Sequence, residues 1–107
     1  MRKCKITVVK KTLFPEIVME YANYGAGHPA CPFYEEGQVF ISNGLDMPDG
    51  FCSWAWGDLV KFIHVMLTGG TYARMNPNGT KDGKVIACCS DGYRPVVFLL
   101  EGIEVPE

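Results

Sequence analysis

One long amphipathic segment places the strongest constraint on the fold of this chain. Apolar side chains between residues 53 and 68 recur at the i, i+3, i+4 spacing of a helix with one buried face: Ala55, Leu59, Phe62, Ile63, Met66 and Leu67. Ser53 is predicted to cap the start of this helix, and Gly69 and Gly70 to end it. Because such a helix must bury its apolar face against another layer, the rest of the chain has to supply that layer.

The rest of the chain reads mainly as short strands. Apolar runs and alternation bounded by turn residues predict strands over residues 4–9, 38–42, 84–89 and 95–101. A short helix is expected after the first strand, with Phe14, Ile17, Val18 and Tyr21 on one face. We therefore predict an α+β fold in the order β-α-β-α-β-β, in which the long helix packs on a small mixed or antiparallel sheet.

Two segments of this predicted fold have a special composition. Residues 96–100 are apolar at every position, which predicts a strand that is covered on both faces. Residues 71–83 are polar and rich in Asn, Asp and Gly, which predicts an exposed loop.

Composition limits the classes of function. A chain of 107 residues is the size of a single domain (1–107), and its 48% hydrophobic content is typical of a globular protein. A net charge of −2 argues against nucleic-acid binding, which needs clustered Lys and Arg. We found neither a secretory signal nor a membrane-spanning stretch and expect a cytoplasmic protein, with a homo-oligomer as a reasonable assembly.

The five cysteines are expected to be reduced thiols, because their number is odd and the predicted compartment is reducing. Cys31, Cys52 and Cys89 lie at the boundaries of predicted elements, where side chains from distant segments meet at one end of a sheet. Cys4 and Cys88 lie inside strands and are predicted to be core residues.

Three segments around these cysteines resemble a known family. Residues 31–40 read C-P-x4-G-x-x-F, residues 50–56 read G-F-C-x-W-A-W, and residues 89–98 read C-x-D-G-x-R-P-V-V-F. In this order they are similar to an uncharacterised family of small bacterial and archaeal proteins. The resemblance extends to the Lys-Cys-Lys-Ile-Thr-Val start but not to residues 71–83. It implies that the three cysteines matter, and it implies no activity.

Our leading hypothesis is a metal- or ligand-binding protein whose site contains Cys31, Cys52 and Cys89. As thiolates they would select zinc, copper(I) or an iron–sulfur cluster, with Asp91 or His28 as a fourth ligand. The spacings contain no C-x-x-C, so the pattern for such a metal site is weak.

Two alternatives remain open. In the first, Cys52 is the catalytic nucleophile of a thiol enzyme or redox factor, because a helix N-terminus favours thiolate, and Cys31 or Cys89 resolves the intermediate. In the second, the chain is a structural or interaction module whose cysteines only pack.

Three further residues are candidates for binding a ligand: Trp54, Asp91 and Arg94. Trp54 and Trp56 are two positions apart, so a helix directs one to the core and leaves the other for a pocket wall. Asp91 is expected to bond backbone amides of its turn. Arg94 is expected to bind an anion or to pair with Asp91 or Glu101.

Overall fold

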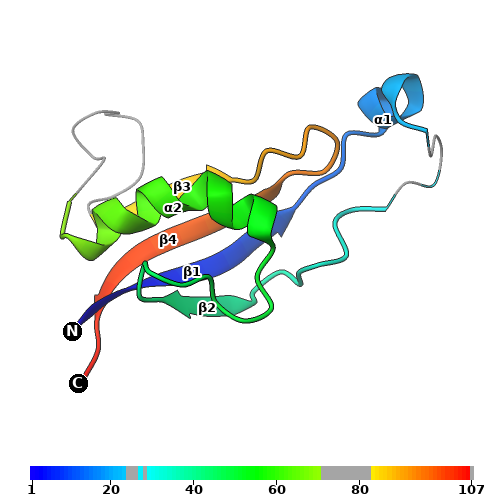
Figure 1. Ribbon diagram of the computed structural model, residues 1–107. Coiled ribbons are helices and arrows are strands. Elements are labelled where there is room, and N and C mark those ends of the chain that lie inside the picture. Colours follow the sequence, from blue (N-terminus) through cyan, green and yellow to red (C-terminus); the bar gives the residue numbers. More distant parts are fainter. Residues whose placement is uncertain (24–26, 28, 71–82, 107) are drawn as a thin grey trace.

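The strands form one antiparallel sheet (Figure 1). The computed structural model describes residues 1–23, 27, 29–70 and 83–106. Its strands are β1 (Arg2–Lys11), β2 (Val39–Ser42), β3 (Lys84–Cys88) and β4 (Val96–Glu104), and they lie in the order β2-β1-β4-β3. The predicted α+β class with an antiparallel sheet is confirmed. The predicted loop at 71–83 falls outside the described residues, apart from Gly83.

The two central strands are longer than their sequence patterns predicted. β1 and β4 pair from Arg2 opposite Glu104 to Lys11 opposite Val96, and the register shifts between Val8 and Lys10. This bulge adds one residue to β1. Val9 is exposed, because alternation with the buried Val8 puts it on the face that α2 does not cover. The long central pair carries the sheet to the end where the predicted site residues lie.

The helix α2 (Ser53–Leu67) packs along one face of the sheet and contacts β1, β3 and β4. Its buried side chains are Ala55, Leu59, Ile63 and Met66, whereas the flanking Phe62 and Leu67 are half-buried. The sheet meets them with Cys4, Ile6, Val8, Val85, Val96, Phe98 and Leu100. Cys4 is a core residue as predicted, and burial raises its pKa to about 11.

The opposite face of the sheet corrects two predictions. Among the described helices, α2 alone packs along the sheet, so the expected double cover of residues 96–100 is wrong: Val97 and Leu99 stay partly accessible. Cys88 is exposed rather than buried, because β3 is an edge strand and this side chain lies on the face that α2 does not cover. Several apolar side chains on this face are exposed and would be covered in a homo-oligomer. The homo-oligomer itself stays a prediction.

The helix α1 (Pro15–Tyr21) projects beyond the end of the sheet (Figure 1). Of its predicted apolar face only Val18 is buried, and Phe14, Ile17 and Tyr21 are exposed. The predicted short helix is present, but most of its apolar face stays accessible because α1 lies beyond the end of the sheet. The N–H of Phe14 donates to the carbonyl of Tyr93 over 2.8 Å and so ties this segment to the turn before β4. None of the described helices has the length and apolar character needed to cross a membrane.

A pair of neighbouring substitutions in β4 tests this one-sided core. Phe98 is fully buried beneath α2, and Leu99 points to the other face. Phe98→Ala is expected to lower the free energy of unfolding in urea by about 3–5 kcal/mol. Leu99→Ala should cost clearly less, because this side chain keeps part of its surface in water. Equal losses for the two variants would contradict the one-sided packing.

Candidate functional site

A cavity of about 500 Å³ lies beside the start of α2. Cys31, Cys52 and Cys89 all line it, although they come from three separate segments of the chain. Each of these thiols is free and half-buried. The walls are mostly apolar and include Phe33, Tyr34, Met47, Phe51, Trp54 and Val96. The convergence that the element boundaries predicted is therefore present in the structure.

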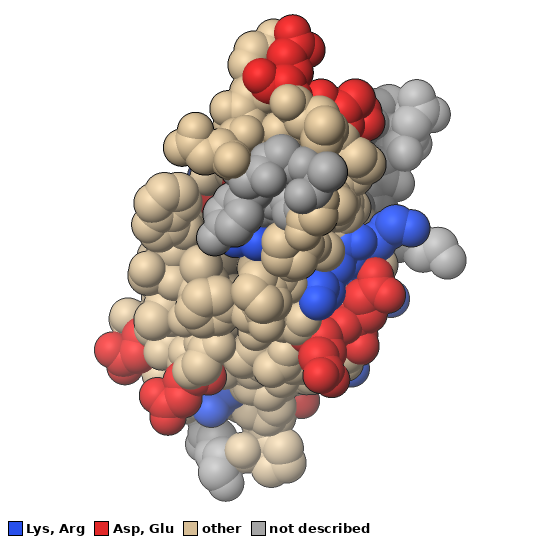
Figure 2. Space-filling model, turned by 90° about the vertical axis from the view of Figure 1, so that its right-hand side faces the viewer, with Lys and Arg blue, Asp and Glu red and all other residues tan. Residues whose placement is uncertain are grey.

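The topology explains why these segments meet. Cys31 lies on the long connection from α1 to β2, Cys52 directly precedes α2, and Cys89 directly follows β3. All three positions fall at the end of the sheet to which α1 is attached (Figure 1). Figure 2 shows the molecule from this side: uncharged residues make up much of the visible surface, and basic and acidic side chains lie among them, some close to the centre of the view.

The ring of Tyr34 forms the boundary between the cavity and the hydrophobic core. Tyr34 is 2% exposed, and its ring meets those of Phe40 and Phe98 edge-on at centroid distances of 5.9 and 5.4 Å. Phe51, one residue before Cys52, lies 5.6 Å from the same ring. Such tilted and edge-to-face pairs are the favourable geometries for aromatic rings. The connection that carries Cys31 is thus held on the core a few residues later.

The hydroxyl of Tyr34 contacts the segment that carries Cys52. The backbone N–H of Cys52 donates a hydrogen bond to the Tyr34 oxygen over 2.9 Å. Burial raises the pKa of Tyr34 to about 12; the Cys52 hydrogen bond opposes this effect, and charge on Cys52, Cys31 and Cys89 adds to it. The hydroxyl therefore stays protonated at neutral pH, and all three thiols lie close enough to influence it.

Cys52, rather than Ser53, is the N-cap residue of α2. Its backbone is extended, with φ −77° and ψ 127°, and its carbonyl accepts the first helical hydrogen bond from Trp56 N over 2.9 Å. The predicted Ser53 cap is wrong, because Ser53 is already helical and the helix has no side-chain cap. Gly50, at φ +78°, makes the turn that delivers Cys52 to this place. The Cys52 thiol is thus free of a capping bond and lines the cavity.

Cys89 is fixed against the start of β4. Its N–H donates to the carbonyl of Val96 over 3.1 Å, and Val96 N–H donates to the Cys89 sulfur over 3.3 Å. The next residue is tied to α2, because Ser90 N–H donates to the Asp58 carboxylate over 2.8 Å. These bonds hold the Cys89 thiol beside the first turns of α2, the helix that directly follows Cys52.

Asp91 and Arg94 form an ion pair within the turn from β3 to β4. The Asp91 carboxylate accepts hydrogen bonds from Tyr93 N at 2.9 Å and Arg94 N at 3.2 Å, and the Arg94 Nε lies 3.4 Å from it. Partial burial alone would raise the pKa of Asp91, but these three donors outweigh it and hold the pKa below its ordinary value. The expected turn bonds and ion pair are present, and a direct role of either residue in ligand binding stays a prediction.

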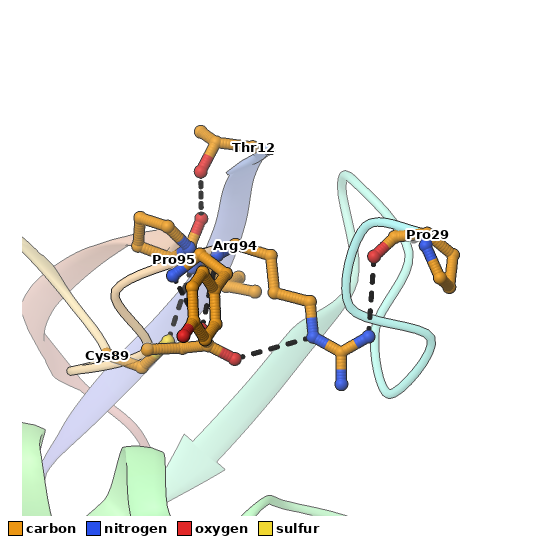
Figure 3. A network of polar contacts seen from close by, with 8 residues as sticks. Thr12, Pro29, Cys89, Arg94 and Pro95 are labelled. Atoms are coloured by element: carbon orange, nitrogen blue, oxygen red, sulfur yellow. Dashed lines mark hydrogen bonds and ion pairs between the residues drawn. The ribbon is translucent and has the colours of Figure 1, made fainter. Parts of the chain in front are cut away.

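Arg94 also reaches the segment that leads to Cys31. Figure 3 shows its guanidinium group extending from the turn to Pro29, whose carbonyl accepts a hydrogen bond from Nη1 over 3.3 Å. In the same view Thr12 bonds to the carbonyl of Pro95 over 2.6 Å. The turn that follows Cys89 is therefore hydrogen-bonded to two other segments of the chain, at Thr12 and at Pro29.

The two tryptophans separate as predicted. Trp54 is 78% exposed and lines the cavity, whereas Trp56 packs against the core, edge-on to Phe51 at 6.3 Å. Phe33, at 60% exposure, also lines the cavity. Trp54 and Phe33 thus place two large, mostly accessible aromatic side chains at the cavity.

Metal-ligating side chains were the basis of the leading hypothesis. Within the described ranges, no group of three or more His, Cys, Asp or Glu side chains is arranged to hold a metal ion. Cys31, Cys52 and Cys89 line the cavity from three separate segments. His28, the predicted alternative ligand, lies outside the described residues. The zinc, copper or iron–sulfur hypothesis receives no support from this geometry and stays a prediction.

Tyr34 and Phe51 are the site residues that the sequence did not reveal. Both lie within the segments that carry Cys31 and Cys52, and the proximity of an aromatic side chain to each cysteine was the only indication.

Comparison with protein families found no match to this chain, and comparisons with curated proteins and with solved structures found none either.

The Asp91 interactions predict a dependence of stability on pH. A carboxyl whose folded pKa is depressed stabilises the fold above its unfolded pKa of about 3.9, and this contribution is lost as the pH falls through the folded pKa. Asp91→Asn should therefore be less stable than wild type at pH 7, and the gap should narrow at acid pH. Urea unfolding at several pH values measures this gap, with the exposed Asp49→Asn as control. A gap that is constant down to the acid limit would contradict the assignment.

Proposed function

We propose that the chain is a cytoplasmic small-molecule-binding protein whose pocket is lined by three reduced thiols. The observation that carries the proposal is the arrangement of Cys31, Cys52 and Cys89 around one mostly apolar cavity. Its volume lies within the range of about 300–1,000 Å³ that is typical of small-molecule sites. The cysteines are all free thiols, which suits a reducing compartment.

The degree of burial favours a functional role over simple packing. A cysteine that only fills space is expected to resemble Cys4, which is fully buried in the core. Cys31, Cys52 and Cys89 instead keep part of their surface accessible and turn it to the cavity. Their distribution around the walls also favours a ligand of several atoms over a single metal ion.

Labelling with N-phenylmaleimide tests the proposal. The exposed Cys88 is first removed by Cys88→Ser, and Cys4 is shielded by burial, so that the pocket thiols remain. Their labelling rate should saturate with reagent concentration, because binding in the cavity precedes the reaction. Cys88 in the wild-type protein is the control and should show a linear dependence. Peptide mass spectrometry assigns each adduct.

A linear dependence at all three pocket cysteines would contradict the binding pocket. Stoichiometric zinc or iron in protein purified without oxygen would instead favour the metal site.

A thiol-dependent redox function is the second candidate, and the position of Cys52 favours it. Its thiol lies at the N-terminus of α2 without a capping bond, where the helix dipole stabilises negative charge. The Cys52 thiolate would attack a small-molecule disulfide and release one thiolate. Cys31 or Cys89 would then attack the mixed disulfide, release the second thiolate and leave a protein disulfide.

Alkylation by iodoacetamide between pH 6 and 9 tests this candidate. The fastest cysteine should react faster than N-acetylcysteine at neutral pH, and Cys52→Ser should remove this phase while Cys31→Ser and Cys89→Ser retain it. If no cysteine outpaces the model thiol at neutral pH, the redox proposal is wrong.

A further inference from the structure

The Tyr34 hydroxyl has one hydrogen-bonding function that the fold does not use. Its oxygen accepts the N–H of Cys52 over 2.9 Å. No described residue accepts a hydrogen bond from it in return, although Tyr34 is 2% exposed. Because the residue lines the cavity, a ligand in that space is the candidate acceptor for this O–H. A buried donor without an acceptor carries a desolvation cost that a suitable ligand would remove.

The electrostatic surroundings limit what this donor would bind. Three thiols and the Asp91 carboxylate line the same cavity, and Arg94 is already paired with Asp91. Arg94 also lines the cavity, but its pairing with Asp91 leaves no unpaired cation among the described lining residues for an anionic ligand. Such a ligand would be repelled by the Asp91 carboxylate. A neutral acceptor on an apolar body fits the aromatic walls and avoids this repulsion.

We propose that Tyr34 is the hydrogen-bond donor of the pocket and that the ligand is a small apolar molecule with a carbonyl oxygen. The proposal rests on the proposed function and names the ligand class for that pocket. A carbonyl oxygen accepts hydrogen bonds and donates none, so it is complementary to a site whose free polar group is a donor. Since burial keeps the hydroxyl protonated, it remains a donor across the physiological pH range.

A carbonyl compound with a conjugated double bond would also react in this pocket. A pocket thiolate would add to the β-carbon, so that the sulfur–carbon bond forms as the double bond opens and its electrons move to the oxygen. The hydrogen bond from Tyr34 would stabilise that oxygen, and water would then supply a proton to the α-carbon. The net change is addition of S–H across the double bond, which needs no oxidant or reductant. Removing a donor to a developing oxyanion slows such steps strongly.

Two reagents of similar size separate the role of Tyr34 as donor from its role in packing. N-phenylmaleimide adds through a carbonyl-activated double bond, whereas benzyl bromide alkylates thiols and has no oxygen. In a Cys88→Ser background, Tyr34→Phe should slow labelling of the pocket cysteines by N-phenylmaleimide about tenfold. It should leave the benzyl bromide rate nearly unchanged. If Tyr34→Phe slows both reagents alike, the cause is a structural disturbance, such as loss of the acceptor for Cys52 N–H, and the inference is overturned.

A second measurement uses unsubstituted Tyr34 and is decisive even if Tyr34→Phe does not fold. Acetophenone and ethylbenzene have similar shapes, but only acetophenone carries a carbonyl oxygen. In the Cys88→Ser protein, acetophenone should protect the pocket cysteines from benzyl bromide at a concentration about tenfold lower than ethylbenzene. Equal protection would overturn the assignment of Tyr34 but leave the pocket intact. Protection by neither compound, together with linear labelling kinetics, would overturn the proposed function itself.

Discussion

The hydrogen bond from Cys52 N–H to the Tyr34 hydroxyl connects the core to the candidate site. On one side, the Tyr34 ring packs among the phenylalanines above the sheet. On the other, its oxygen contacts the N-cap residue of α2, which carries one of the cavity thiols. Together with Phe51, which packs against the same rings, this buried phenol positions Cys52 relative to the core.

A second set of interactions holds the other walls to this centre. Asp58 on α2 accepts a hydrogen bond from the N–H of Ser90, so the residue after Cys89 is bonded directly to the helix. Arg94 pairs with Asp91 and reaches the carbonyl of Pro29, which precedes Cys31 by two residues. Each thiol thus lies next to a contact that crosses between segments, and the pocket is a property of the tertiary fold rather than of any one motif.

Periodicity was sufficient to predict α2 and the strands, because spacing fixes which side chains share a face. It does not specify how many layers cover a sheet, which is why Cys88 and residues 96–100 were placed in a second buried face that the described part of the chain does not form. The meeting of Cys31, Cys52 and Cys89 was predicted from their expected places at element boundaries, which holds for Cys52 and Cys89, whereas Cys31 lies within the long connection from α1 to β2. The contribution of Tyr34 was not, because it depends on contacts between residues that are distant in the sequence.

The central claim is that three thiols from separate segments share one cavity, and a single bulky adduct tests it most directly. Protein carrying one N-phenylmaleimide group on Cys52 is isolated, and iodoacetamide is then used to measure the reactivity of the remaining cysteines. Because the adduct fills much of the shared space, Cys31 and Cys89 should react far more slowly than in unlabelled protein, while the exposed Cys88 keeps its rate. Unchanged rates at Cys31 and Cys89 would show that the three thiols do not share a pocket.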